Sequence, residues 1–351
     1  MLGVVALAVI AYLFFAVGVV PAIVAFVMAL VPLILVVLTI AWIDRWEPEP
    51  RAALAFALLW GGAASIAIAL LFSYAAMIAQ QLSGVPDSFG TVFLSAVVQA
   101  PIVEEAAKGL GILILFWAAR RNFDGPVDGL VYGAMVGIGF AFTENIQYFG
   151  LALASDGLGG VSEIFFLRGI LSPFAHVMFT ACTGLVIGLA AKRAGAFGAI
   201  GYLLLGLIPA ILLHALWNGA SFLVTNFYGY YVVVQVPLFA IAIGVVLYLR
   251  GQERRITAER LTEYADVGWF TPAEVAILST DAGRRAGAAW ARRHGLAREF
   301  TRFTTNAARL AFARQRTVTG RARIGAQRDE AALLGLIAVD REKLSVLPPL
   351  P

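Results

Sequence analysis

The sequence predicts an all-α membrane protein: a polytopic bundle of about eight transmembrane helices followed by a cytoplasmic helical tail. Of its 351 residues, 60% are hydrophobic and only 14% are charged, whereas soluble domains carry about 25% charged residues. Its apolar runs are long enough to cross a bilayer core of about 30 Å, which takes roughly 20 helical residues. These observations predict a multi-pass protein of the cell membrane.

The apolar runs predict a transmembrane domain over residues 1–250. Pro21 and short polar or glycine-rich segments, among them DRWEPEPR, QQLSGVPDSFG and SDGLGG, separate the runs. The predicted spans lie near residues 2–20, 22–43, 52–80, 93–118, 127–150, 164–190, 197–224 and 229–249.

Basic residues predict the orientation of these spans. Lys and Arg fall in alternate connections, including DRWEPEPR, ARRNFDG and AKRAG, and again just after the last span. Because cytoplasmic loops carry the excess of Lys and Arg, we expect both termini in the cytoplasm. Arg168, near the outer end of the sixth span, is an exception.

Residues 251–351 form a predicted cytoplasmic, basic, helical tail. Charge rises there and apolar periodicity falls, while Thr271, Pro272 and Glu274 have the pattern of a helix start. The net charge of +4 suits a surface near lipid headgroups or a cytoplasmic partner better than a nucleic-acid-binding face. We expect the tail to be dispensable for the chemistry.

Polar groups that lipid would reject occur in four of the predicted spans. Such residues usually face a protein interior, because a charge at the bilayer centre costs about 2.5 kcal/mol or more. At 1.5 Å per residue, the acids and histidines lie at similar depths, roughly 9 to 18 Å from the outer surface. They are Glu104, Glu105 and Lys108 of VEEAAKG, Glu144 and Asn145 of FTEN, His176, and His214 and Asn218 of HALWN.

Each group also has a simpler structural interpretation. Glu104 and Lys108 stand four residues apart and could neutralise each other, which leaves Glu105, turned by about 100°, without a local partner. Each histidine could be a hydrogen-bonded packing residue, and the asparagines could link helices. Two histidines facing three carboxylates favour a common site, in which Lys108 keeps a carboxylate ionised and Glu105 acts as general base.

Two reaction schemes suit this set of residues. In one, His176, His214 and a carboxylate, with Glu144 as the candidate, hold Zn²⁺ and an activated water. In the other, no metal is needed, because a glutamate and a histidine polarise the water directly. Either scheme hydrolyses an amide, and Asn218 could donate to the oxyanion. Cys182, the single cysteine, excludes a zinc site built on cysteines.

Four motifs in order resemble the PrsW family of intramembrane proteases, distant relatives of the CAAX prenyl endopeptidases. They are EEAAK, FAFTEN, the sixth-span histidine and HALWN, and DRWEPEP is also similar. The resemblance covers roughly residues 40–220. It implies an intramembrane endopeptidase, usually classed as a metalloprotease, that cleaves membrane proteins, for example single-span anti-sigma factors.

The resemblance also implies roles for individual residues. It makes Glu104 and Glu105 essential acids, Glu144 and Asn145 polar residues of the second motif, and His176 and His214 ligands or water-orienting groups. The tail lies outside the match.

Two other classes of function remain open from the sequence alone. A transporter or channel could use the same residues as a proton or cation site, although the polar motifs show no inverted repeat and no matched pair of broken helices. A non-enzymatic membrane scaffold could retain the polar site without using it.

Overall fold

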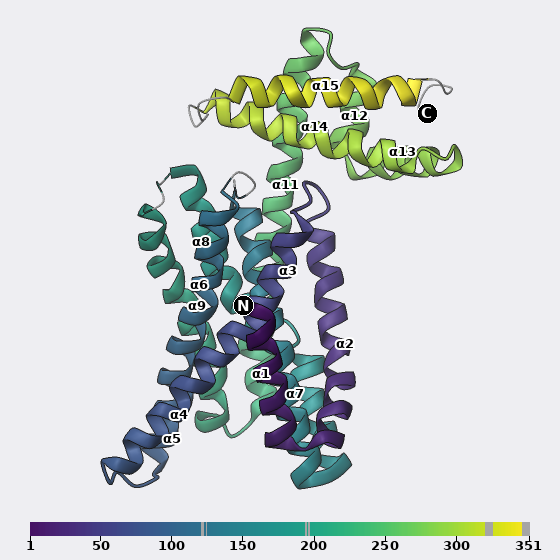
Figure 1. Ribbon diagram of the computed structural model, residues 1–351. Helices are drawn as coiled ribbons and strands as arrows, with labels where there is room; N and C mark the ends of the chain where they lie inside the picture. Colours follow the sequence, from purple (N-terminus) through teal and green to yellow (C-terminus); the bar gives the residue numbers. More distant parts are fainter. Residues whose placement is uncertain (121–122, 124, 194, 196, 320–325, 346–351) are drawn as a thin grey trace. The chain divides into compact units, whose positions relative to one another are not determined.

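The computed structural model describes residues 1–351 without 121–122, 124, 194, 196, 320–325 and 346–351, and these residues form helices joined by turns and loops. No strand occurs among these residues (Figure 1). The all-α fold predicted from the sequence is confirmed. Arg121 of the ARRNFDG connection and Ala194 of AKRAG lie outside the described residues.

The chain divides into two compact units. Unit 1 contains residues 1–44 and 49–244, and unit 2 contains residues 45–48 and 245–351. The chain passes from unit 1 to unit 2 and back at residues 45–48, and passes to unit 2 again within one helix, α11 (Val236–Asp266).

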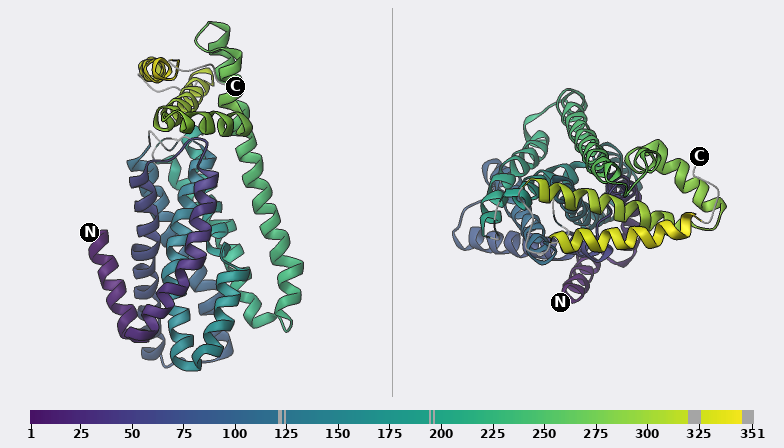
Figure 2. Two further views of the ribbon diagram at one scale, coloured as in Figure 1. Left: turned by 90° about the vertical axis from the view of Figure 1, so that its right-hand side faces the viewer. Right: turned by 90° about the horizontal axis from the view of Figure 1, so that it is seen from above.

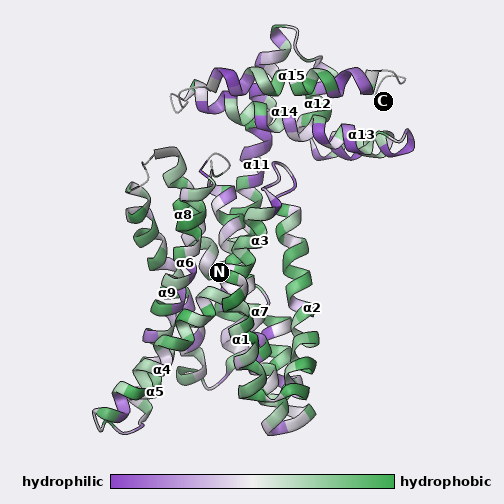
Figure 3. Ribbon diagram, in the orientation of Figure 1, coloured by the Kyte–Doolittle hydropathy of each residue, from purple (hydrophilic) through white to green (hydrophobic). Residues whose placement is uncertain are grey.

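Unit 1 is an apolar helix bundle, coloured mostly as hydrophobic in Figure 3. Its other helices are α1 (Leu2–Val17), α2 (Val19–Ile43), α3 (Arg51–Leu59), α4 (Ile66–Leu82), α5 (Phe89–Phe93), α6 (Ala100–Ala118), α7 (Pro126–Phe165), α8 (Ala175–Arg193), α9 (Gly198–Leu223) and α10 (Phe227–Tyr230). Single π-helical segments interrupt these rods: η1 (Trp60–Ser65), η2 (Leu94–Gln99), η3 (Phe166–Leu171) and η4 (Tyr231–Gln235).

Each apolar run predicted as a span is mainly helical, which supports a polytopic membrane bundle; the run 164–190 is interrupted at residues 172–174. By length and composition, five helical stretches among the described residues can cross a membrane. These are Val19–Ile43, Arg51–Leu82, Pro126–Ala191, Gly198–Leu223 and Phe227–Asp266. Three differences separate these five stretches from the eight predicted spans. The Pro126–Ala191 stretch contains two predicted spans, and α1 is too short to be counted. Helix α6 is not among the five, and it carries the charged residues Glu104, Glu105 and Lys108. The total of eight spans and their orientation stay predictions.

Glycines let α7 approach the neighbouring helix α8 closely. A Cβ atom on Gly129 would lie 2.1 Å from the carbonyl oxygen of Gly184, and one on Gly137 would lie 2.6 Å from that of His176. Side chains larger than hydrogen would push the helices apart at both positions, as is usual for small residues in membrane helix interfaces. This contact sets the position of His176 against α7.

Unit 2 is a separate small helical unit with its own core. It contains the end of α11, α12 (Pro272–Ser279), α13 (Asp281–Arg293), α14 (Ala297–Val318) and α15 (Ala326–Ser345). Helices α14 and α15 run side by side (Figure 2). The predicted helix start is confirmed, because the Thr271 hydroxyl accepts from the backbone N–H of Glu274 and the Glu274 carboxylate accepts from that of Thr271. Buried side chains such as Phe270, Trp290 and Phe303 fill the core.

The loop residue Trp46 belongs to unit 2 and is only 2% exposed. Its indole N–H donates to the Thr257 hydroxyl at 2.9 Å. The guanidinium of Arg284 lies 3.6 Å from the centre of its ring and donates to its backbone carbonyl at 2.9 Å. Four residues of the loop after α2 are therefore part of the folded C-terminal unit.

Candidate active site

Lys108 of α6 forms the centre of a buried polar cluster in unit 1. Its side chain is fully buried, its Nζ lies 2.7 Å from Glu105 Oε1 and 3.5 Å from Glu104 Oε2, and the ring centre of Phe140 is 3.7 Å away. The expectation that Glu105 lacks a local partner is wrong. Residues three apart on a helix are neighbours as well as residues four apart, and here Lys108 is closer to Glu105.

Glu105 is fully buried and its carboxylate is fully engaged. Besides Lys108, it accepts a hydrogen bond from the Thr180 hydroxyl at 2.9 Å, and Nδ1 of His214 lies 3.1 Å from Oε1. A carboxylate that accepts from one imidazole nitrogen fixes the tautomer and leaves the other nitrogen as a lone-pair donor. Glu105 therefore orients His214 so that Nε2 faces the rest of the cluster.

Unlike Glu105, Glu104 has a carboxylate oxygen that is free to accept a further hydrogen bond or bind a metal ion. Its Oε2 is buried and has no hydrogen-bond partner among the described residues, although the Lys108 ammonium and His214 Nε2, at 3.9 Å, lie near it. Its side chain is 14% exposed, whereas that of Glu105 is 0% exposed. Glu104, not Glu105, is the acid that can take up a further partner.

His176 of α8 faces His214 of α9. The centres of the two rings are 5.0 Å apart and the ring planes are nearly perpendicular. Nδ1 of His176 lies 3.1 Å from Lys108 Nζ, and Nε2 lies 2.8 Å from Glu144 Oε2. Phe179 stacks on His214 with ring centres 5.1 Å apart. Helices α6, α7, α8 and α9 thus bring all the predicted acids and histidines into one cluster: Glu104, Glu105, Glu144, His176 and His214.

Glu144 and Asn145 of α7 are held by Arg168, which is not among the site residues predicted from the sequence. Arg168 of η3 forms an ion pair with Glu144 through Nη2 and donates through Nε to Asn145 Oδ1 at 2.8 Å. The sequence carries a signal for it, since Arg168 is the basic residue that departs from the alternation of Lys and Arg between connections.

Asn218 lies one turn after His214 and donates from Nδ2 to the carbonyl of Ala96 at 2.9 Å. Ala96 belongs to η2, the π-helical segment that precedes α6. The side chain therefore links α9 to the segment before α6. In this arrangement, one of its two amide hydrogens is not available to an oxyanion.

The DRWEPEP segment contributes a second polar contact in unit 1, away from the histidines. Both carboxylate oxygens of Asp44 accept from the backbone N–H of Glu49 at 3.2 Å. The Tyr132 hydroxyl of α7 donates to Glu49. Both acids are buried, so this motif ties the end of α2 to α7.

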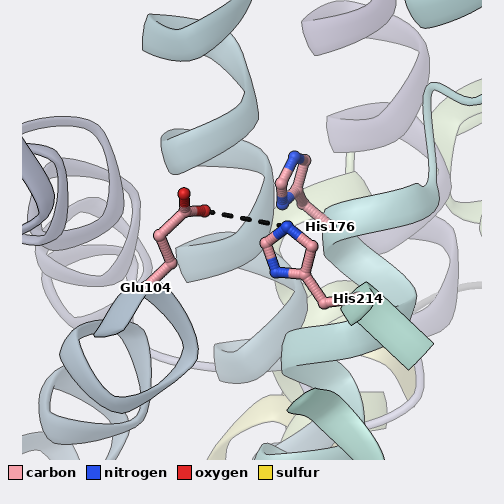
Figure 4. Close-up of side chains that lie close together, drawn as sticks. All are labelled: Glu104, His176 and His214. Carbon is pink, nitrogen blue, oxygen red and sulfur yellow. Dashed lines mark ion pairs between the residues drawn. The ribbon is translucent and has the colours of Figure 1, made fainter. Parts of the chain in front are cut away.

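Glu104, His176 and His214 supply a donor set of the kind that binds a divalent metal ion. Nε2 of His176 faces the Glu144 carboxylate, so Nδ1 would be the ligand atom, and it would have to exchange the Lys108 ammonium, 3.1 Å away, for the ion. One ligand atom from each lies within 4.8 Å of the others, and Figure 4 shows the three side chains converging. Two imidazoles and one carboxylate form a known set for catalytic Zn²⁺, and the unpartnered oxygen of Glu104 lies within the set. The structure groups Glu104 with the histidines, whereas Glu144 is the carboxylate ligand predicted from the sequence.

Comparison with protein families gives a match over the whole candidate site. The model of the family described as "PrsW family intramembrane metalloprotease" matches residues 49–242, which is more than half of the chain and contains every candidate site residue.

Curated relatives carry the name "Protease PrsW". The one from Clostridioides difficile is 27% identical over 193 residues, which are 55% of this chain and 77% of the relative. Those from Bacillus subtilis and Shouchella clausii are 30% and 32% identical over 129 and 139 residues, or 37% and 40% of this chain. The matches span 55% and 58% of these two relatives. No solved structure matches the chain.

Proposed function

Because the chain belongs to the PrsW family of intramembrane proteases, we propose that it is an endopeptidase that hydrolyses peptide bonds of membrane proteins at the Glu104–His176–His214 cluster. The observation that carries the proposal is the convergence of these three donors inside an apolar helix bundle. Hydrolysis at such a place requires groups that activate water, and imidazole and carboxylate are the side chains suited to this task.

Glu104, His176 and His214 would hold the metal in a metalloprotease mechanism. When bound there, Zn²⁺ would supply Lewis-acid polarisation of a scissile carbonyl and would lower the pKa of a water molecule to about 7. Glu105 keeps Nε2 of His214 available, since it accepts from Nδ1. The buried Lys108 ammonium lies beside both Glu105 and Glu104 and offsets part of their negative charge.

A metal-free mechanism uses the same residues in other roles. Glu104 would then accept the proton of the attacking water, and the histidines would orient that water. The structure supports Glu104 in this role rather than Glu105, because the carboxylate of Glu105 is already engaged by Lys108, Thr180 and His214. Metal content separates the two mechanisms.

We propose single-span membrane proteins as the substrate class. The substrate must reach a site that lies between membrane helices. A single membrane-spanning helix already lies in the bilayer and can approach the site laterally, without separation from other helices of its own chain. The alternation of Lys and Arg supports both termini in the cytoplasm, as proposed from the sequence. Anti-sigma factors are one example of such substrates, by analogy with the family.

The test is cleavage by the purified protein in detergent, with candidate single-span proteins as substrates. We expect Glu104→Gln and His214→Gln each to lower kcat/KM by at least about 100-fold. Because residues that act as a unit are non-additive, the double variant should be little worse than the poorer single one.

His294 provides a matched control. It is the remaining histidine of the chain, it follows α13 in unit 2, and its Nδ1 lies 2.9 Å from the carbonyl of Trp290. His294→Gln should cleave as the wild type does. Full cleavage by Glu104→Gln, or equal losses in His294→Gln, would contradict the proposed site, whereas a wild type that cleaves no substrate would favour the scaffold or transporter class.

A further inference from the structure

Arg168 is a charged residue beside the cluster that the mechanism above does not use. It lies in η3, between α7 and α8, and its side chain is 18% exposed. A guanidinium in an apolar bundle is costly unless it is paired. Its partners therefore indicate what it does.

Three partners of Arg168 lie within five consecutive residues of α7. Nη2 pairs with Glu144, Nε donates to Asn145 Oδ1 at 2.8 Å, and the guanidinium lies 4.2 Å from the centre of the Tyr148 ring. A guanidinium is planar and presents its donors in a fixed fork. It therefore sets the direction of the Glu144 carboxylate as well as balancing its charge.

The backbone that carries Arg168 is itself held in place. The Ser172 hydroxyl donates to the carbonyl of Leu167 at 2.7 Å, and the Tyr231 hydroxyl donates to that of Leu171 at 2.6 Å. The two hydroxyls therefore hold carbonyls near the start and at the end of the π-helical segment η3. The guanidinium is thus presented from a fixed segment.

Glu144 shares its carboxylate between Arg168 and His176. The oxygen that pairs with Arg168, Oε2, also lies 2.8 Å from His176 Nε2. Without the arginine, this carboxylate would be free to turn toward the same metal ion that Glu104, His176 and His214 fit. The three carboxylates of the cluster would then face one cation, Lys108, in place of two.

We propose that Arg168 is a positioning residue of the protease site, which holds Glu144 against His176 and keeps Glu144 out of the metal-binding set. The proposal rests on the proposed function. In chemical terms, Arg168 keeps Glu144 as a hydrogen-bond acceptor for His176, and Glu104 remains the carboxylate ligand.

The first test is a double-mutant cycle in the cleavage assay. Arg168→Met should lower kcat/KM by at least about tenfold, and Arg168→Lys should retain more activity because it keeps the charge. Since Arg168 acts through Glu144, Arg168→Met/Glu144→Gln should be no worse than Glu144→Gln alone. Losses that multiply would show that Arg168 acts independently and would overturn the proposal.

The second test does not need turnover. Metal-stripped protein is titrated with Co²⁺, whose visible absorption spectrum reports the number and type of ligands. We expect Arg168→Met to change the spectrum, because Glu144 joins the ligands, and Arg168→Met/Glu144→Gln to restore the wild-type spectrum. Glu163→Gln, an exposed charge change near the end of α7, should leave spectrum and cleavage unchanged.

The outcomes separate this inference from the proposed function. If the wild type cleaves no substrate but Arg168→Met alters the Co²⁺ spectrum in the way described, the positioning role stands and the proposed activity fails. If Arg168→Met matches the wild type in both assays, the positioning role fails while the proposed activity stands. A wild type that neither cleaves nor binds Co²⁺ overturns both.

Discussion

Oε1 of Glu105 lies 3.1 Å from Nδ1 of His214, and the same oxygen lies 2.7 Å from the ammonium of Lys108. One buried carboxylate thus holds an imidazole and a cation that come from different helices, α9 and α6. The two neighbouring glutamates therefore have different roles. Glu105 positions His214 and Lys108, and Glu104 faces the space where a metal ion or water would lie.

The two glutamates should therefore differ when each is changed to glutamine. Glu105→Gln removes the charge partner of a fully buried lysine, which typically costs about 3–5 kcal/mol, so both thermal stability and cleavage should fall. Glu104→Gln should abolish cleavage with little loss of stability, because Oε2 of Glu104 makes no hydrogen bond among the described residues. Thermal unfolding in detergent beside the cleavage assay measures both. Equal stability of the two variants would contradict this division.

Lys108→Met should be among the most destabilising single changes in unit 1. It leaves Glu105 buried without its cation, again at a cost of about 3–5 kcal/mol. Adding Glu105→Gln should recover part of the stability, because replacing both members of a buried pair is often nearly neutral. The double variant should still fail to cleave, since His214 has lost its charged acceptor. A double variant less stable than Lys108→Met would argue against the pair.

The helices and the membership of the cluster could be predicted because lipid imposes strong rules. A span needs roughly 20 apolar residues, so runs such as 197–224 are visible in the sequence. A charge inside such a run must face protein, so Glu104, Glu144, His176 and His214 could be expected to meet.

The partners within the cluster could not be predicted in the same way. A rotation of about 100° separates adjacent residues on a helix, and this decides whether Glu104 or Glu105 meets His214. The π-helical turn of η3 shifts the helix phase and turns Arg168 toward Glu144, yet no periodicity marks such a turn. The hydrogen bond from Thr180 to Glu105 could not be predicted either, because nothing in the sequence distinguishes Thr180 from other small polar residues of an apolar helix.

The metal-binding set makes a prediction about stoichiometry. If Glu104, His176 and His214 hold Zn²⁺, the purified protein should contain about one ion per chain, since three such ligands form one catalytic zinc site. His176→Gln should lose the ion, and His294→Gln should keep it. Elemental analysis of protein purified without chelator measures the content. A metal-free wild type with full activity would support the mechanism in which Glu104 is the general base.

The C-terminal unit should matter for stability more than for chemistry. A chain that ends at residue 256 lacks Thr257 and Arg284, which bury Trp46 in unit 2. We expect this truncation to retain cleavage in detergent, as every candidate site residue precedes residue 250. It should also become sensitive to protease at residues 45–48. Limited proteolysis tests this expectation, with Arg255→Met, an exposed arginine paired with Glu259, as the control in the full-length chain.

Asp44 at the end of α2 should give stability a pH dependence of its own. Burial raises the pKa of its carboxyl from 3.8 to about 7, although the hydrogen bond from the Glu49 backbone opposes this shift. Between these values the folded chain binds a proton at Asp44 that the unfolded chain does not. The free energy of unfolding therefore falls as pH rises through this window, by up to about 4 kcal/mol for roughly three pKa units.

Asp44→Asn isolates this contribution, because an amide stays neutral and can still accept the hydrogen bond from Glu49. Measured by chemical denaturation between about pH 4 and pH 8, the variant should gain stability relative to the wild type as pH rises, and the difference should level off above about pH 7. Other carboxylates titrate equally in both proteins and cancel in the difference. A difference that is constant with pH would mean that the pKa of Asp44 is the same in the folded and the unfolded chain, so that burial does not raise it.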